Sequence, residues 1–144
     1  MSRTLRIKSS SPADTEKIGA TLAKQLGPGS VMALYGQLGA GKTVLVQGIC
    51  RALDAEIPAS SPSFVIANHY PGILPVYHLD LYRLNNLEDL INLGYEEYFY
   101  GSGVCLIEWA DKAAELLPAK RWDVELRIIS EQEREIRINR RDGQ

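Results

Sequence analysis

The sequence is poor in cysteine and contains no long apolar run. Its two cysteines, Cys50 and Cys105, each lie within an apolar segment of the 144 residues. We therefore expect free, buried thiols in a reducing compartment rather than a disulfide or a metal site. No segment approaches the roughly 18 apolar residues that a membrane-spanning helix needs, so we expect a cytoplasmic protein without membrane association.

An excess of basic residues is also missing. The chain carries 16 Lys and Arg against 18 Asp and Glu, which gives a formal net charge of −2. A protein that holds nucleic acid by itself usually has a clear basic excess, because contacts to phosphates supply much of the affinity. If RNA takes part in the function, we expect another subunit to hold most of it and this chain to act on it indirectly.

What remains is the composition of an ordinary soluble domain. Hydrophobic residues make up 45% and charged residues 24% of the chain. A length of 144 residues suits one compact domain, which we place at residues 1–144.

The pattern of apolar residues predicts an α/β fold. Residues 4–8 alternate as a strand does, and Ser11 precedes Pro12 as a helix cap would. The apolar runs Val31–Tyr35 and 104–107 are typical of buried strands in a parallel sheet. The other expected elements are a helix over 42–53, strands over 63–70 and 76–81 joined by Pro71-Gly72, a helix from its cap Asn86 to Leu93, a helical segment over 110–117, and a closing hairpin of 124–129 and 135–138. Strands and helices in this mixture predict an α/β sandwich.

One segment matches a known phosphate-binding motif at every position. The segment that follows the apolar run 31–35 matches the pattern G-x-x-x-x-G-K-[ST], and it reads Gly36-Gln37-Leu38-Gly39-Ala40-Gly41-Lys42-Thr43. Glycines let the backbone curl around phosphate oxygens, and the loop amides and the next helix N-terminus face the anion. Lys42 can reach the β- and γ-phosphates, and the Thr43 hydroxyl can bind Mg²⁺. The strand before and the helix after the motif are the context it requires, which argues against a chance glycine-rich turn.

Two acidic residues could complete such a site. Glu108 follows the apolar strand 104–107, where an acid can reach Mg²⁺ beside the loop, although a solvent-facing glutamate fits this position equally well. Asp80 would share one strand face with His78 and Tyr82, which suggests a site, yet an ordinary solvent face explains the pattern slightly better. His69 and His78 are too isolated to predict a zinc site.

The chain resembles the TsaE (YjeE) family. The resemblance covers nearly the whole chain and depends on the order and spacing of five blocks: Gly36–Thr43, Ser61-Pro62-Ser63-Phe64, His78-Leu79-Asp80-Leu81-Tyr82-Arg83-Leu84, residues 93–99, and Leu106-Ile107-Glu108-Trp109. Together with the predicted elements, it implies a P-loop NTPase-like three-layer sandwich with a mixed sheet.

The resemblance also implies a function. Members of the family are ATPases needed for threonylcarbamoyladenosine at position 37 of tRNAs that read ANN codons, and they act with TsaB and TsaD. By match, ATP and Mg²⁺ would be the ligands. Lys42 and the loop amides would hold phosphates, Thr43 and Glu108 would bind the metal, and Asp80 would position a water. Further residues would lie near the nucleotide, namely Trp109, Ser11, Thr15 and Arg134.

Two positions depart from the family pattern. Gln37 stands where the family usually has an acid, which removes a negative charge near the phosphates. Ser63 replaces a threonine but keeps the hydroxyl, so a contact with the metal or the γ-phosphate would survive.

Two other functions were weighed against the ATPase. A small-molecule or nucleotide kinase also uses a P-loop, but it needs a second substrate pocket and usually a lid, and no insertion here is long enough to be a clear lid. A GTP-dependent switch would read guanine with an Asn-Lys-x-Asp segment, and the sequence contains none.

Overall fold

The computed structural model describes residues 3–55, 67–70 and 74–143. Strands and helices alternate along the chain. In order they are β1 (Arg3–Ser9), α1 (Pro12–Ala23), β2 (Val31–Tyr35), α2 (Lys42–Ala52), β3 (Ala67–Tyr70), β4 (Val76–Asp80), α3 (Leu87–Leu93), α4 (Tyr95–Phe99), β5 (Val104–Glu108), the 3₁₀ helix η1 (Ala110–Ala113), β6 (Lys120–Ile128) and β7 (Arg134–Asp142).

The described strands form one mixed sheet of seven strands in the order β1-β7-β6-β2-β5-β4-β3. The central strands β6, β2, β5 and β4 run parallel, whereas β1, β7 and β3 join antiparallel at the two sides. Parallel strands need crossover connections, and here helices supply them. The α/β fold class and the mixed sheet predicted from the sequence are confirmed.

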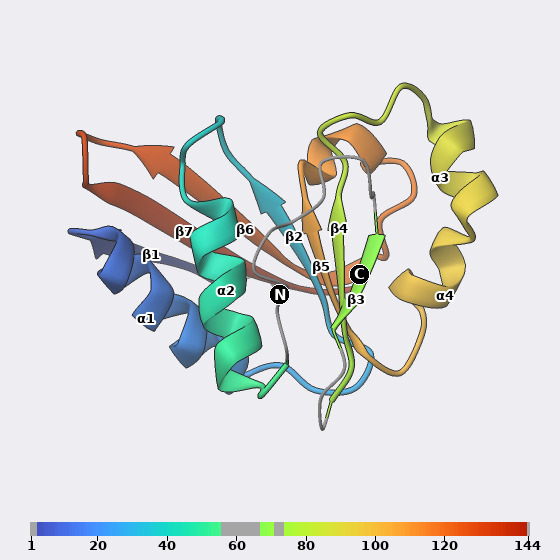
Figure 1. Ribbon diagram of the computed structural model, residues 1–144, viewed down its shortest axis with the longest axis horizontal. Helices are drawn as coiled ribbons and strands as arrows, with labels where there is room; N and C mark the ends of the chain where they lie inside the picture. Colours follow the sequence, from blue (N-terminus) through green and yellow to red (C-terminus); the bar gives the residue numbers. More distant parts are fainter. Residues whose placement is uncertain (1–2, 56–66, 71–73, 144) are drawn as a thin grey trace.

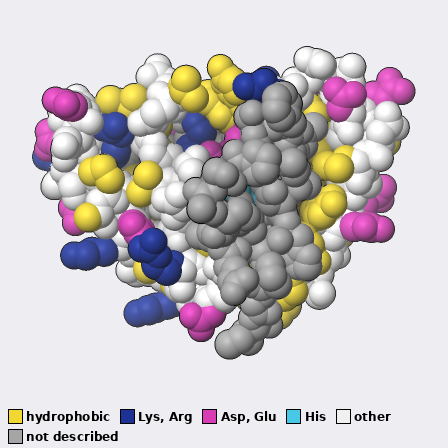
Figure 2. Space-filling model, in the orientation of Figure 1, with side chains coloured by type: hydrophobic (Ala, Val, Ile, Leu, Met, Phe, Trp, Pro, Cys, Tyr) yellow, Lys and Arg dark blue, Asp and Glu magenta, His cyan; other side chains and the backbone are white. Residues whose placement is uncertain are grey.

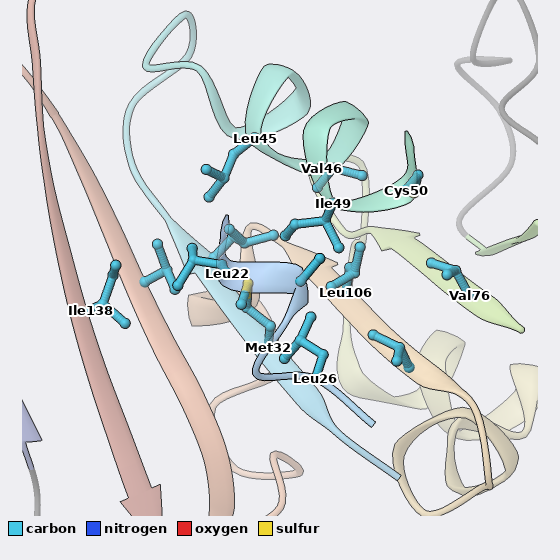
Figure 3. Packing of buried hydrophobic residues seen from close by; sticks show 14 of the residues in the cluster. Leu22, Leu26, Met32, Leu45, Val46, Ile49, Cys50, Val76, Leu106 and Ile138 are labelled. Atoms are coloured by element: carbon cyan, nitrogen blue, oxygen red, sulfur yellow. The ribbon is translucent and has the colours of Figure 1, made fainter. Parts of the chain in front are cut away.

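Helices α1 and α2 cover one face of this sheet (Figure 1). Their apolar side chains pack against alternate residues of the central strands, including Met32 and Leu34 of β2 and Leu106 of β5. Figure 3 shows Leu45, Val46 and Ile49 of α2 directed toward this layer. Successive side chains of a strand point to opposite faces of the sheet, so central strands such as β2 and β5 contribute to this core and to a second core on the other face.

The second core lies on the opposite face of the sheet. Ala33, Leu79 and Ile107 point to this side and pack with Leu90 of α3 and Phe99 of α4. Residues of η1 also belong to this core. The two cores and the sheet between them make the three-layer sandwich that was expected. None of the helices in the described part of the chain has the length and apolar character needed to span a bilayer.

Most element predictions agree with the structure, and two were wrong in extent. Ser11 and Asn86 cap α1 and α3 as expected, with side-chain oxygens that accept the amide N–H groups of Asp14 and Asp89. The segment 110–117 forms only the short 3₁₀ helix η1 and then turns. Its amides bond to the carbonyl three residues back, as Lys112 does to Trp109, and no side chain of the described residues caps its first turn. The closing hairpin is longer than predicted. The expected Pro71-Gly72 turn and residues 63–66 of the expected strand lie outside the described residues.

Candidate functional site

The glycine-rich loop leaves the sheet where its parallel strands end. Residues 36–41 join β2 to α2. β2 lies between β5 and β6 and runs parallel to both, so the carboxyl ends of the three strands meet at one edge. Open α/β sheets bind their ligands at this edge. The loop is therefore a neighbour of Glu108, which ends β5.

Three glycines allow the tight path of the loop. Gly36, Gly39 and Gly41 have φ of 150°, 83° and 101°, a region that strains residues with a side chain. A Cβ at Gly36 would also lie 2.7 Å from the carbonyl oxygen of Leu126 on β6. Backbone conformation thus favours glycine at all three positions, and at Gly36 the close approach of the neighbouring strand excludes a side chain as well.

The other three loop positions present mainly backbone to the site. The Ala40 amide donates to the carbonyl of Gln37 at 3.0 Å, which closes a turn. Leu38 at the tip is 72% exposed, whereas Ala40 is buried. Contacts of this turn with a phosphate would therefore come from its amide N–H groups.

Lys42 begins α2, and its ammonium folds back onto the loop. The residue is 4% exposed. Its Nζ donates to the carbonyl oxygens of Gly36 and Gln37 and lies 3.8 Å from the centroid of the Trp109 ring, a cation–π contact. Burial lowers the pKa of Lys42. Three carboxylates act on this pKa in the opposite direction, namely Glu108, Asp80 and Asp111.

Thr43 and Glu108 are in direct contact although 65 positions separate them in the chain. The Thr43 hydroxyl donates to Oε1 of Glu108 at 3.1 Å and lies 3.4 Å from Oε2. Glu108 is 3% exposed, so the solvent-facing alternative considered from the sequence does not hold. A hydroxyl and a carboxylate side by side are the hard oxygen donors that Mg²⁺ prefers, and this pair fits the metal predicted there.

His78 also contacts Glu108, although its sequence position did not predict a role in the site. It lies in the middle of β4, is 4% exposed, and its Nε2 lies 2.5 Å from Oε2 of Glu108. The one signal in the sequence was its position two residues before Asp80, which places both on the same strand face. Sequence patterns could not reveal its partner, because Glu108 belongs to another strand.

Asp80 ends β4 directly opposite Glu108 in the parallel β4–β5 register. The two carboxylates therefore project from the same sheet face at the same edge. Oδ1 of Asp80 accepts the amide N–H of Tyr82 at 3.0 Å. This bond fixes the turn that follows β4 and holds one oxygen of the carboxylate.

Trp109 follows Glu108 in an unusual backbone conformation. Its φ is 58°, in the left-handed region that a bulky residue seldom adopts. The ring packs against Tyr82, with 4.9 Å between ring centroids, and against the Lys42 ammonium. The strained conformation thus coincides with a position beside the loop, as such conformations often do at functional sites.

The predicted residues at the start of the first helix use their hydroxyls away from the loop, although Thr15 lies close to Gly41. Ser11 Oγ caps α1, and the Thr15 hydroxyl lies 2.7 Å from that of Ser9 in a buried pair. The methyl group of Thr15 lies 3.7 Å from where a Cβ on Gly41 would stand. Thr15 therefore contacts the loop through its apolar side.

Arg134, at the start of β7, also reaches the loop. One of its terminal nitrogens donates to the carbonyl oxygen of Gly39 at 3.1 Å, and the other donates to carbonyls in the turn 130–133. The predicted site residue of the last hairpin is thus attached to the loop backbone. The remaining expected contact, Ser63, lies outside the described residues.

These features define a class of protein. A central parallel strand, a loop with the full glycine, lysine and threonine pattern, and a helix that begins at its lysine form a P-loop nucleotide-binding fold. Comparison with known proteins then identifies the family. The family model described as "Threonylcarbamoyl adenosine biosynthesis protein TsaE" matches residues 9–136, and the chain belongs to this family.

Individual relatives agree with this membership. The tRNA threonylcarbamoyladenosine biosynthesis protein TsaE of Treponema pallidum is 40% identical over 134 residues, which are 93% of this chain and 99% of the relative. The protein of the same name from Bacillus subtilis is 39% identical over 133 residues, covering 92% of this chain and 83% of the relative. The crystal structure of Bacillus subtilis YdiB superposes with a TM-score of 0.79 at 35% identity, covering 97% of this chain and 87% of that one.

Proposed function

We propose that this protein is the ATP-binding and ATP-hydrolysing subunit required for threonylcarbamoyladenosine modification at position 37 of tRNAs that read ANN codons, and that it acts with TsaB and TsaD. Membership in the TsaE family and the names of its relatives support the place in tRNA modification. The observation that carries the ATPase assignment is the contact between Thr43 of the loop and the buried Glu108.

The positions of the site residues suggest a separate role for each of them. Loop amides and Lys42 bind the β- and γ-phosphates, for which the ammonium exchanges its loop carbonyl partners for phosphate oxygens. Thr43 and Glu108 hold Mg²⁺, which would neutralise the charge that develops on the phosphates. Asp80 orients the attacking water, because its carboxylate projects at the same edge as Glu108. Trp109 and Arg134 support the loop from either side.

The proposal places the protein in the cytoplasm as a single domain that meets tRNA through its partners. The formal net charge of −2 favours this indirect contact. A kinase remains the alternative function that an experiment should separate from the ATPase.

The first experiment measures ATP hydrolysis by the protein alone and then with the TsaB–TsaD pair, with the Lys42→Ala variant as the blank. We expect low turnover alone and a clear rise with the pair. No change with the pair, together with rapid transfer of phosphate to a small metabolite, would instead establish the kinase.

A further inference from the structure

Glu108 has a second partner whose role the nucleotide chemistry does not require. His78 is buried in β4, with the apolar residues Tyr77 and Leu79 before and after it. Its Nε2 lies 2.5 Å from Oε2 of Glu108. A carboxylate that binds a metal ion only accepts hydrogen bonds, so in the proposed site the imidazole is the donor of this contact.

The contact is set by strand register rather than by a flexible side chain. In the parallel β4–β5 pair, His78 stands opposite Leu106 and Asp80 stands opposite Glu108. The imidazole therefore reaches forward along the sheet to the carboxylate that ends the neighbouring strand. Both residues are at most 4% exposed, so water is a poor substitute for either partner.

The two oxygens of the carboxylate consequently have different surroundings. Oε2 is held by His78, whereas Oε1 is the oxygen closer to the Thr43 hydroxyl, at 3.1 Å against 3.4 Å for Oε2. A carboxylate bonded at one oxygen loses its freedom to rotate, and its other oxygen then points in a constant direction. Here that direction is toward Thr43.

We propose that His78 is a positioning residue that orients Glu108 toward the metal of bound Mg·ATP, an inference that rests on the proposed nucleotide function. The imidazole acts as a hydrogen-bond donor, not as a ligand, base or acid. Partners of metal ligands commonly change metal affinity when they are replaced, because they fix the ligand's orientation.

The test compares two side chains of similar length at position 78. His78→Gln keeps a donor near the position of Nε2, and His78→Met fills similar space without a donor. Calorimetry measures the binding of Mg·ATP and, separately, of ATP in EDTA. We expect His78→Met to weaken Mg·ATP binding about 10- to 100-fold and His78→Gln to stay within about threefold of wild type, with little change for ATP in EDTA.

Two results would overturn the proposal. Wild-type affinity for Mg·ATP in His78→Met would show that the donor is unnecessary, and an equal loss of ATP binding in EDTA would show that His78 supports the loop in general. If His78→Met does not fold, His78→Asn replaces it, since its shorter amide stops before Oε2 and should behave like Met. A wild-type protein that binds no Mg·ATP would refute the nucleotide function itself, which distinguishes that failure from a failure of the role of His78.

Discussion

At the scale of single residues, the site is a chain of contacts that passes from the loop to the sheet. Lys42 lies between loop carbonyls and the ring of Trp109, and Thr43 contacts Glu108, which in turn contacts His78. Lys42, His78 and Glu108 are all nearly inaccessible to water. Buried charged and polar groups are tolerated when they are paired, so each substitution here should affect its neighbours as well.

Removal of the Lys42 ammonium should have the largest effect on nucleotide binding. In Lys42→Ala we expect ATP binding measured by calorimetry to fall about 10- to 150-fold, because a charge-assisted contact to the phosphates contributes about 1.5–3 kcal/mol. Lys24→Ala is the matched control, since Lys24 is exposed at the end of α1. Equal ATP affinity in Lys42→Ala and wild type would show that the loop 36–43 is not the nucleotide-binding site.

Glu108→Ala should impair catalysis more than folding. We expect Mg²⁺-dependent ATP turnover to fall by roughly 100-fold, the scale seen when one fixed electrostatic group of an active site is lost. The change removes a buried charge but also takes this hydrogen-bond partner from buried His78, so we expect the melting temperature to fall by several degrees while the protein stays folded. Turnover and melting temperature are measured on the same samples, with exposed Glu115→Ala as the control. A variant that is unfolded at room temperature would make Glu108 a structural residue instead.

At the scale of secondary-structure elements, the loop depends on the elements around it. The hairpin of β6 and β7 supports it from one side, through the Leu126 carbonyl near Gly36 and the bond from Arg134 to Gly39. Helix α1 supports α2 from the other side. The two helices approach so closely that a Cβ at Gly48 of α2 would lie 2.1 Å from the carbonyl oxygen of Glu16.

This close approach leads to a stability prediction for Gly48→Ala. Alanine favours a helix over glycine by about 1 kcal/mol, whereas forcing an extra methyl group against a backbone carbonyl costs about 1–3 kcal/mol. Because the clash is with backbone, we expect it to dominate and to lower the free energy of unfolding in urea by roughly 1–2 kcal/mol. Gly27→Ala is the control, since nothing lies within 4 Å of its Cβ position. Equal stability of the two variants would mean that α1 and α2 separate without cost.

At the scale of the whole molecule, the chain carries a formal net charge of −2, and its acidic residues are partly gathered on two helices. Figure 2 shows acidic side chains projecting from the side formed by α3 and α4. The acids of these helices are Glu88, Asp89, Glu96 and Glu97. Several arginines of β6 and β7 are already paired with acids of the same sheet, as in Arg121 with Asp123 and Arg137 with Glu135. Each such pair offsets one positive charge that a polyanion could otherwise contact.

We therefore expect the isolated protein not to bind tRNA measurably. Filter binding at physiological salt should give no saturable complex below about 10⁻⁴ M, the weak end of non-specific nucleic-acid binding. The same assay with the TsaB–TsaD pair added tests whether tRNA is held there. Micromolar binding by the isolated chain, with a steep dependence on salt concentration, would contradict the indirect contact that we propose.

The parts of the fold that could be predicted from the sequence are those whose conformation depends on neighbouring residues in the chain. The loop 36–43, the caps Ser11 and Asn86 and the apolar strands are short segments whose conformation follows from their own residues, and the structure agrees with them. The segment 110–117 shows the limit, since its helical composition did not produce an α-helix where no side chain in the described part of the chain caps the first turn. Helix ends depend on neighbours that composition does not weigh.

The sequence was sufficient for the chemistry of the loop, because the residue types that surround a phosphate are adjacent in the chain. It was also sufficient to place Glu108 at the end of a buried strand. The strand order, the contact of Thr43 with Glu108 and the approach of His78 to the same carboxylate required the folded protein. These contacts join residues 30 to 65 positions apart, and only the pairing of β4 and β5 and the packing of α2 bring such residues together.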